Sequence, residues 1–70
     1  MPQRHVERIR NILNALDDDP FESLAAPGYR LHPLKGNRKG QWAVRVSKNW
    51  RITFRFERGE VYDIDLEDYH

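Results

Sequence analysis

Apolar residues near the N-terminus recur at the spacing of an α-helix. Four of them, separated by three or four positions, fall on one helical face: Val6, Ile9, Leu13 and Leu16. Ile12 and Ala15 widen this face. Pro20 disfavours helical geometry in the residue before it, so the pattern predicts a helix over about residues 2–17. Residues 19–22 then read as a capping box, which predicts a second, short helical turn.

Beyond residue 28 the apolar residues alternate with polar ones, as they do in β-strands. Large apolar and aromatic residues fill every second position of two segments, and arginines fill several of the others. The pattern predicts four strands: residues 29–34, 42–46, 50–56 and 61–66. Short connections between them favour an antiparallel meander with one apolar and one basic face.

We therefore expect an α+β fold, in which the N-terminal helix packs on a small four-stranded antiparallel sheet over about residues 29–66. The helical face should be buried against Trp42, Val44, Trp50, Ile52 and Phe54.

The length of the chain limits what it can do. Seventy residues form one domain, residues 1–70, and exclude a multi-domain enzyme. A domain of about 60 residues buries only about 60% of its unfolded surface, so we expect little net stability. The absence of cysteine excludes disulfides, Cys-based zinc sites and thiol chemistry. No apolar run reaches the roughly 18 residues of a membrane span and no signal peptide is present, so a cytoplasmic protein without a membrane partner is expected.

Charged residues are sorted along the chain, although the formal net charge is only +1. Residues 29–56 hold eight Lys and Arg and no acid, whereas residues 57–70 hold six acids and one Arg. An acid-free basic stretch of this length indicates a polyanionic partner such as RNA; the alternative is an ordinary solvated sheet face. Candidate RNA-binding residues are Arg38, Lys39, Arg45, Lys48, Asn49 and Arg55. Asp63 and Asp65 are expected to pair with arginines of the neighbouring strand.

Residues suited to metal-free RNA cleavage are also present. The reaction needs a base for the 2′-OH proton, an acid for the leaving 5′-oxygen, and cations for the charge that develops on the phosphate. Candidates for these roles are His32, Lys35, Arg51, Asp68, Tyr69 and His70. A surface histidine and a frayed chain end are the alternatives for His32 and His70. No metal-ligand spacing and no phosphate-binding glycine loop occurs, so neither a metal nor a small-molecule cofactor is expected.

Three short motifs occur in a specific order: His-Pro-Leu-Lys-Gly at 32–36, Asn-Trp-Arg-Ile at 49–52 and Asp-Tyr-His at 68–70. In this order and spacing, from about Pro2 to His70, the sequence resembles the HigB branch of the RelE/ParE toxin superfamily. The resemblance implies a RelE-like fold and a type II toxin that enters the ribosomal decoding site and cuts messenger RNA without a metal. It also implies a helix-turn-helix antitoxin, similar to HigA, that silences the toxin.

The resemblance implies roles for individual residues. His32 and Lys35 match positions near the scissile phosphate, and Arg51 matches a phosphate-contacting arginine. The C-terminal catalytic group of the family, in the tail at 67–70, matches Asp68, Tyr69 and His70. The general base and the general acid stay open among His32, Asp68 and His70. A gyrase poison similar to ParE, which shares the fold without cutting RNA, and a non-catalytic RNA-binding module are the alternative functions.

The sequence departs from the family in one respect. Members of the family usually start about 20 residues earlier, with a strand and a helix before the position of Pro2. An incomplete gene model, a truncation and a true short form are the three explanations. If the missing strand belongs to the sheet, an exposed strand edge and apolar surface are expected, which favour dimerisation or aggregation.

Overall fold

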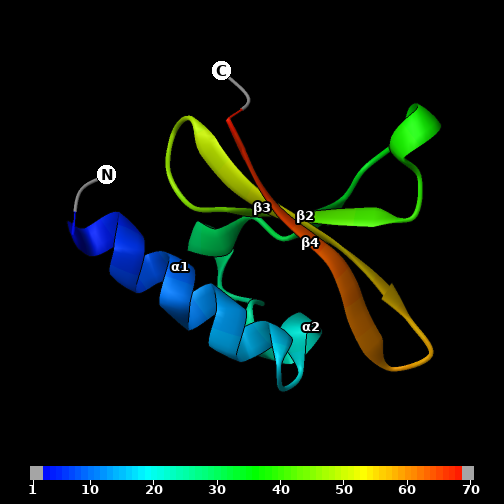
Figure 1. The fold of residues 1–70 in the computed structure, drawn as a ribbon, viewed down its shortest axis with the longest axis horizontal. Coiled ribbons are helices and arrows are strands. Elements are labelled where there is room, and N and C mark those ends of the chain that lie inside the picture. The colour runs from blue at the N-terminus through cyan, green and yellow to red at the C-terminus, as the bar shows by residue number, and fades with distance from the viewer. Residues whose placement is uncertain (1–2, 69–70) are drawn as a thin grey trace.

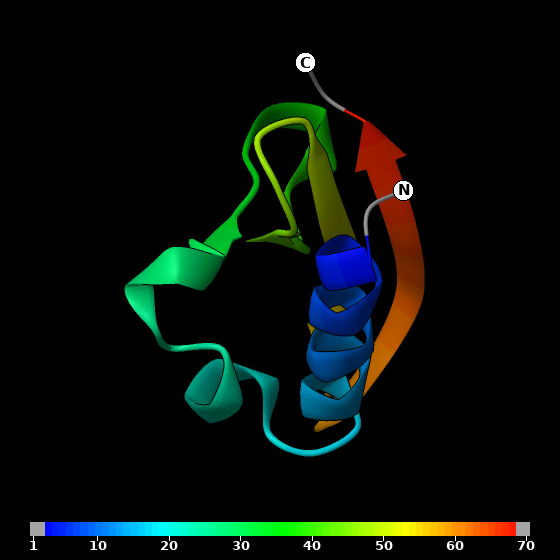
Figure 2. The same cartoon turned by 90° about the vertical axis from the view of Figure 1, so that its left-hand side faces the viewer.

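The computed structural model describes the backbone of residues 3–68 and the side chains of residues 5–68. Its elements are α1 (Gln3–Leu16), α2 (Pro20–Ser23), the 3-10 turn η1 (Pro27–Tyr29), β1 (His32–Pro33), the 3-10 turn η2 (Gly36–Arg38), β2 (Gln41–Arg45), β3 (Trp50–Glu57) and β4 (Glu60–Asp68). The four strands form one antiparallel sheet in the order β1-β2-β3-β4. Figure 1 and Figure 2 show α1 on one side of this sheet. The predicted α+β fold is confirmed.

The buried side of α1 differs from the predicted one. Ile12 and Leu16 are buried in the core, and Ile9 packs against it. Val6 and Leu13, in contrast, are 38% and 42% exposed. The prediction that these two residues pack on the sheet is therefore wrong. The apolar stripe of this helix is wider than its contact with the sheet, so one flank of the stripe stays in solvent.

The core lies between α1, α2 and the sheet. Its buried members are Ile12, Leu16, Leu24, Val44, Val46, Ile52 and Phe54. Trp42 and Trp50 pack against these residues, which confirms the predicted apolar face of the sheet. Phe21 of α2 meets the Trp42 ring edge to face, with the ring centroids 4.8 Å apart. The predicted start of α2 is also confirmed, because the Asp19 side chain accepts a hydrogen bond from the Glu22 backbone N–H.

The first strand is much shorter than predicted. The strand covers only His32–Pro33, whereas residues 29–34 were expected to form it, although the Leu34 N–H also donates a 2.8 Å hydrogen bond to the Gln41 carbonyl oxygen of β2. Arg30, just before the strand, adopts a left-handed backbone conformation with φ of 49°, which interrupts an extended chain. Pro33 is tolerated in this edge strand because the hydrogen bond at Leu34 makes Pro33 a position whose N–H would point away from β2. β4, in contrast, extends beyond the predicted residues 61–66 at both ends.

A β-bulge in β4 determines which of its side chains share a face. Tyr62 lies opposite Arg55 and Glu67 lies opposite Arg51, with a shift of register between the two pairs. Without this shift, strict alternation from Tyr62 would turn Glu67 toward the helix side of the sheet. Asp63 lies at the shift and has a left-handed φ of 54°, which aspartate tolerates better than most residues. The bulge thereby brings Glu67 to the same face as Arg51.

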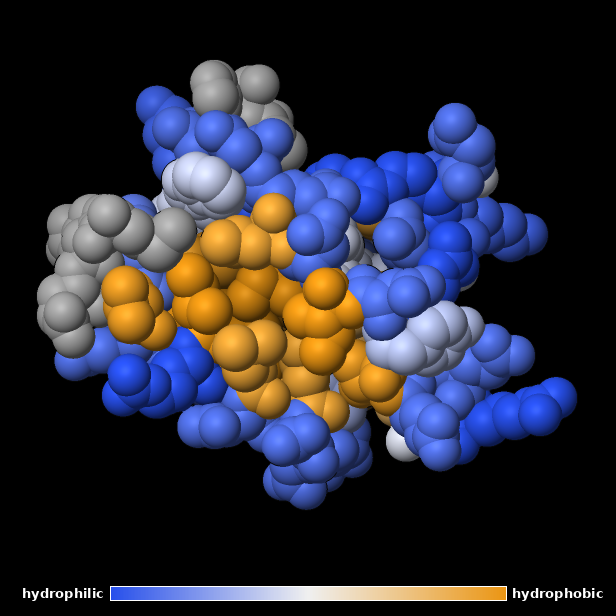
Figure 3. Space-filling view, viewed as in Figure 1, coloured by the Kyte–Doolittle hydropathy of each residue, from blue (hydrophilic) through white to orange (hydrophobic). Residues whose placement is uncertain are grey.

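Apolar surface stays exposed along α1 and β4. Val6, Leu13, Ile64 and Leu66 are between 38% and 49% exposed, and we call them the apolar strip. Figure 3 shows apolar residues gathered on this side of the molecule. β4 is also an edge strand of the sheet. An edge strand beside exposed apolar side chains suits the binding of another polypeptide.

Within residues 3–68, no helix is long and apolar enough to cross a membrane.

Candidate active site

The sheet face turned away from α1 carries the predicted basic residues. Residues directly opposite each other in antiparallel strands share a face, so the pairing defines rows of side chains. One row consists of Arg45, Arg51 and Glu67, and the next of His32, Ala43, Thr53 and Asp65. Arg55 lies in a third row, between Gln41 and Tyr62. We call the surface formed by His32, Arg45, Arg51 and Arg55 the basic face. The prediction that three strand arginines share a face is confirmed.

Glu67 binds two arginines at once on this face. Its carboxylate accepts hydrogen bonds from both terminal nitrogens of Arg38, at 2.9 and 2.5 Å. It also accepts a 3.1 Å hydrogen bond from Nε of Arg51, and Nη2 of Arg51 lies 3.0 Å from the same oxygen. Nε of Arg38 donates a further hydrogen bond to the Gln41 side-chain oxygen at 2.7 Å. We call Arg38, Arg51 and Glu67 the arginine–glutamate cluster.

These contacts shift the pKa values of two members of the cluster, Glu67 and Arg38. The hydrogen bonds from Arg38 hold the pKa of Glu67 below its usual value; partial burial opposes this effect, and the bond from Arg51 adds to it. The same contact raises the pKa of Arg38. The side chains of Arg51 and Glu67 are only 19% and 22% exposed, so water and salt screen this pair less than an open surface pair. The lowered pKa of Glu67 and the raised pKa of Arg38 therefore keep this pair charged near neutral pH.

The centre of the basic face lies under the cluster. Ala43 and Thr53 are completely buried, although they are on the face away from α1. Arg38 contacts Gln41 in the row on one side of Thr53 and Glu67 in the row on the other side. The Arg38 side chain therefore crosses over Thr53. The Thr53 hydroxyl has no hydrogen-bond partner among the described residues.

His32 lies exposed at the edge of the basic face, with one ring nitrogen held in place. Its Nδ1 is 2.5 Å from the carbonyl oxygen of Arg30. Because a carbonyl only accepts, Nδ1 carries the proton in this contact, and Nε2 of the neutral ring is left as an acceptor. His32 on β1 and Arg51 on β3 lie one row apart on either side of β2, so their Cα atoms are roughly 12 Å apart.

The other predicted catalytic residues are not all on this face. Lys35 is exposed at the start of η2, in the connection between β1 and β2. Asp68 ends β4 opposite Trp50, which places it on the helix side of the sheet. Tyr69 and His70 lie outside the described residues.

The predicted RNA-binding residues are distributed between the face and its loops. Lys39 is exposed after η2, and Lys48 and Asn49 are exposed in the turn between β2 and β3. Arg55 lies 3.6 Å from the Asp63 carboxylate, so the expected pairing of Asp63 with a neighbouring arginine is confirmed. Asp65, in contrast, lies opposite Thr53 rather than an arginine of β3, and its carboxylate accepts a 2.9 Å hydrogen bond from the Leu66 N–H, so the expectation for Asp65 is not confirmed.

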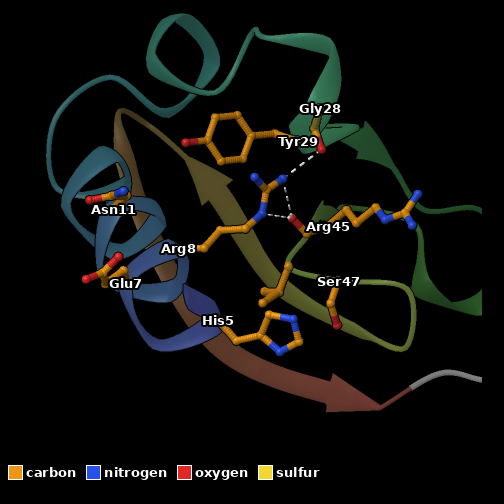
Figure 4. Close-up of a pocket in the computed structure, with 9 residues that line it drawn as sticks. His5, Glu7, Arg8, Asn11, Gly28, Tyr29, Arg45 and Ser47 are labelled. Atoms are coloured by element: carbon orange, nitrogen blue, oxygen red, sulfur yellow. Dashed lines mark hydrogen bonds between the residues drawn. The ribbon is translucent and has the colours of Figure 1, made fainter. Parts of the chain in front are cut away.

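Sequence reasoning missed Glu67 and Arg8. For Glu67, the available signal was an acid in the strand that pairs with arginine-rich β3. Arg8 lies at a hollow between α1, η1 and the end of β2, shown in Figure 4. It donates hydrogen bonds to the carbonyl oxygens of Gly28, at 2.7 Å, and Arg45, at 3.1 and 3.2 Å. Its guanidinium also lies over the Tyr29 ring, 4.5 Å from the centroid. Arg8 thereby ties α1 to the backbone at the end of β2.

A comparison with known protein families identifies the family of this chain. The sequence profile described as "RelE-like toxin of type II toxin-antitoxin system HigB" matches residues 1–70, the whole chain. The chain belongs to the HigB-like toxin family. A relative, "Endoribonuclease HigB" of Proteus vulgaris, is 45% identical to this HigB-like toxin over 71 residues, which cover 100% of the chain and 77% of the relative.

The fold comparison agrees with the family. A solved structure, "YoeB/ParE toxin from Agrobacterium tumefaciens", superposes with a TM-score of 0.64 at 27% sequence identity. The match covers 96% of this HigB-like toxin and 75% of that chain. The resemblance to HigB and the RelE-like fold, both predicted from the sequence, are confirmed. As a type II toxin, the protein has an antitoxin as its partner. Within residues 3–68, no group of three or more acidic or histidine residues could hold a metal ion.

Proposed function

We propose that this HigB-like toxin is an endoribonuclease that cuts messenger RNA at the ribosome, without a metal ion, and so inhibits translation. The observation that supports the proposal is the basic face, which brings His32, with Nε2 as an acceptor, onto the same side of the sheet as Arg45, Arg51 and Arg55. The 45% identical relative, which is named an endoribonuclease, supports the same activity. A gyrase poison or a non-catalytic RNA-binding module would not need a histidine with a free acceptor nitrogen beside these arginines.

In the proposed reaction, Nε2 of His32 accepts the proton of a ribose 2′-hydroxyl while its oxygen attacks the adjacent phosphorus. The bond from phosphorus to the 5′-oxygen then breaks, and the leaving oxygen takes a proton from a general acid in the tail, for which we propose His70, since Asp68 ends β4 on the helix side of the sheet. Arg51 and Lys35 stabilise the negative charge that develops on the phosphate. The products are a 2′,3′-cyclic phosphate on one fragment and a 5′-hydroxyl on the other.

The remaining assignments concern binding and partners. We propose that RNA is held by Arg38, Lys39, Arg45, Lys48, Asn49 and Arg55. Tyr69 would stack on a base or fix the geometry of the tail. The antitoxin would be a helix-turn-helix protein similar to HigA, and the exposed apolar strip supports a protein partner. The ribosome supplies the messenger RNA, which places the toxin in the cytoplasm.

Primer extension on messages translated in a cell-free extract tests the proposal. Wild-type toxin should produce discrete stops inside translated codons and none in untranslated RNA. His32→Gln, and separately a chain that ends at Glu67, should each lose about 10²- to 10⁴-fold in cleavage rate. His5→Gln removes a histidine of α1, outside the basic face, and should cleave like the wild type.

The alternatives give different results in the same preparation. RNA binding without cleavage would indicate an RNA-binding module, and inhibition of gyrase supercoiling without RNA cleavage would indicate a ParE-like poison. Either result would overturn the proposed function. Cleavage that survives both His32→Gln and removal of the tail would overturn the proposed roles of these residues.

A further inference from the structure

Glu67 joins three parts of the proposed active site. Its carboxylate takes four contacts from Arg38 and Arg51, all between 2.5 and 3.1 Å. Arg38 belongs to η2, which starts directly after Lys35. Glu67 itself precedes Asp68 at the end of β4. One carboxylate therefore ties the β1–β2 connection to β3 and to the start of the tail.

Arg51 needs a counter-charge in its row. Arg45 lies directly opposite Arg51 on β2, and Glu67 lies directly opposite it on β4. Like charges that face each other across neighbouring strands repel. Arg45 therefore repels the Arg51 guanidinium from the β2 side of the row. Glu67 attracts Arg51 from the other side and contacts two of its guanidinium nitrogens, which restrains both the position and the direction of the group. The lowered pKa of Glu67 keeps its carboxylate charged wherever the toxin works near neutral pH.

We propose that Glu67 is a positioning residue for RNA cleavage, which holds the Arg51 guanidinium at the reacting phosphate without itself touching the RNA. This role rests on the proposed function. Two arginines against one carboxylate leave the cluster with a net positive charge, so it still attracts a phosphate. Loss of the carboxylate would make both arginines more available to RNA, yet it would remove the two contacts by which Glu67 directs the Arg51 guanidinium when charge develops on the phosphate. RNA binding and the chemical step should therefore respond in opposite directions.

Glu67→Gln tests this role, because it keeps the size of the side chain and removes its charge. We expect kcat for cleavage on programmed ribosomes to fall by about 10- to 100-fold, while KM stays the same or falls. Glu60→Gln makes the same change of charge at the other end of β4 and should keep the wild-type kcat. An unchanged kcat in Glu67→Gln would overturn the proposal. An increase in KM with an unchanged kcat would also overturn it, since Glu67 would then act in binding.

A second readout does not depend on activity. The Nε–Hε signal of Arg51 in a nitrogen–proton NMR spectrum, assigned with Arg51→Lys, should move in Glu67→Gln and stay in place in Glu60→Gln. If the toxin cleaves RNA but the Arg51 signal does not move in Glu67→Gln, the positioning role is wrong and the proposed function stands. If the signal depends on Glu67 but the wild type cleaves no RNA, the proposed function is wrong and the catalytic role of Glu67 is wrong with it.

Discussion

Two neighbouring residues of α1 provide a direct test of how the helix packs. Ile12 is 0% exposed in the core, whereas Leu13 is 42% exposed on the flank of the helix. Replacing Ile12 by alanine leaves a cavity between α1 and the sheet, which should cost about 2–5 kcal/mol of unfolding free energy. Replacing Leu13 removes a side chain that is already largely in water, which should cost about 1 kcal/mol or less.

This difference is large for a domain of this size. At about 0.05–0.15 kcal/mol per residue, the whole chain has a stability on the order of 4–10 kcal/mol. In small domains, each kcal/mol lost lowers Tm by roughly 4–8 °C. Ile12→Ala should therefore lower Tm by about 10 °C or more, and it removes a large share of the total stability. Leu13→Ala should lower Tm by only a few degrees.

Thermal and urea unfolding of the purified chain measures both variants. The fluorescence of Trp42 and Trp50 reports the transition, because both rings pack against the core. The urea dependence of the unfolding free energy should be the same for wild type and variants, so that the change in midpoint reports stability alone. Equal losses for the two variants, or a larger loss for Leu13→Ala, would refute the burial of Ile12 and the exposure of Leu13 described for α1.

Three further predictions concern polar groups. Arg8→Lys should lower Tm, because an ammonium group cannot reproduce the fork of bonds that the guanidinium makes to two carbonyls; a wild-type Tm would contradict the tie described for Arg8. Arg51→Ala should reduce ribosome-dependent cleavage more than Arg55→Ala, and each variant should show a weaker dependence of binding on salt; equal, small effects would make the basic face an ordinary solvated surface. Since the folded pKa of Glu67 is lowered, its contribution to stability is complete above its ordinary value of 4.5 and is lost as the pH falls through the folded value. The difference in Tm between wild type and Glu67→Gln should therefore stay constant above pH 4.5 and shrink as the pH falls below it, and a difference that persists unchanged in acid would contradict the ion pair with Arg38.

Local periodicity is sufficient to predict α1, β2 and β3, since each carries an uninterrupted repeat of apolar residues. The side of α1 that is buried against the sheet could not be predicted in the same way. Its apolar stripe includes both Ile12 and Leu13, and the choice between them depends on the shape of the sheet surface. The length of β1 depends on the left-handed turn at Arg30, which hydrophobic patterning does not report.

The bulge at Asp63 is the feature least visible in the sequence. Strict alternation over residues 61–66 predicts that Asp63 and Asp65 share one face of a regular strand. The extra residue at the bulge turns Leu66, opposite Ile52, to the helix side and Glu67, opposite Arg51, to the basic face. The contacts between Glu67 and the arginines follow from that insertion. A prediction of the cluster would therefore have required the register of β4, which is a property of the folded sheet.

The same register explains how charges sorted along the sequence become interleaved in space. Acid-rich β4 lies directly beside β3, so Arg51 and Arg55 each have a carboxylate from β4 close by. Lys35, Lys39 and Lys48 remain exposed in the two loops that flank β2. A lysine is a flexible point charge, whereas a paired arginine has a fixed direction. On the proposed function, the loop lysines would attract the RNA backbone, and the strand arginines, held by β4, would meet its phosphate in one geometry.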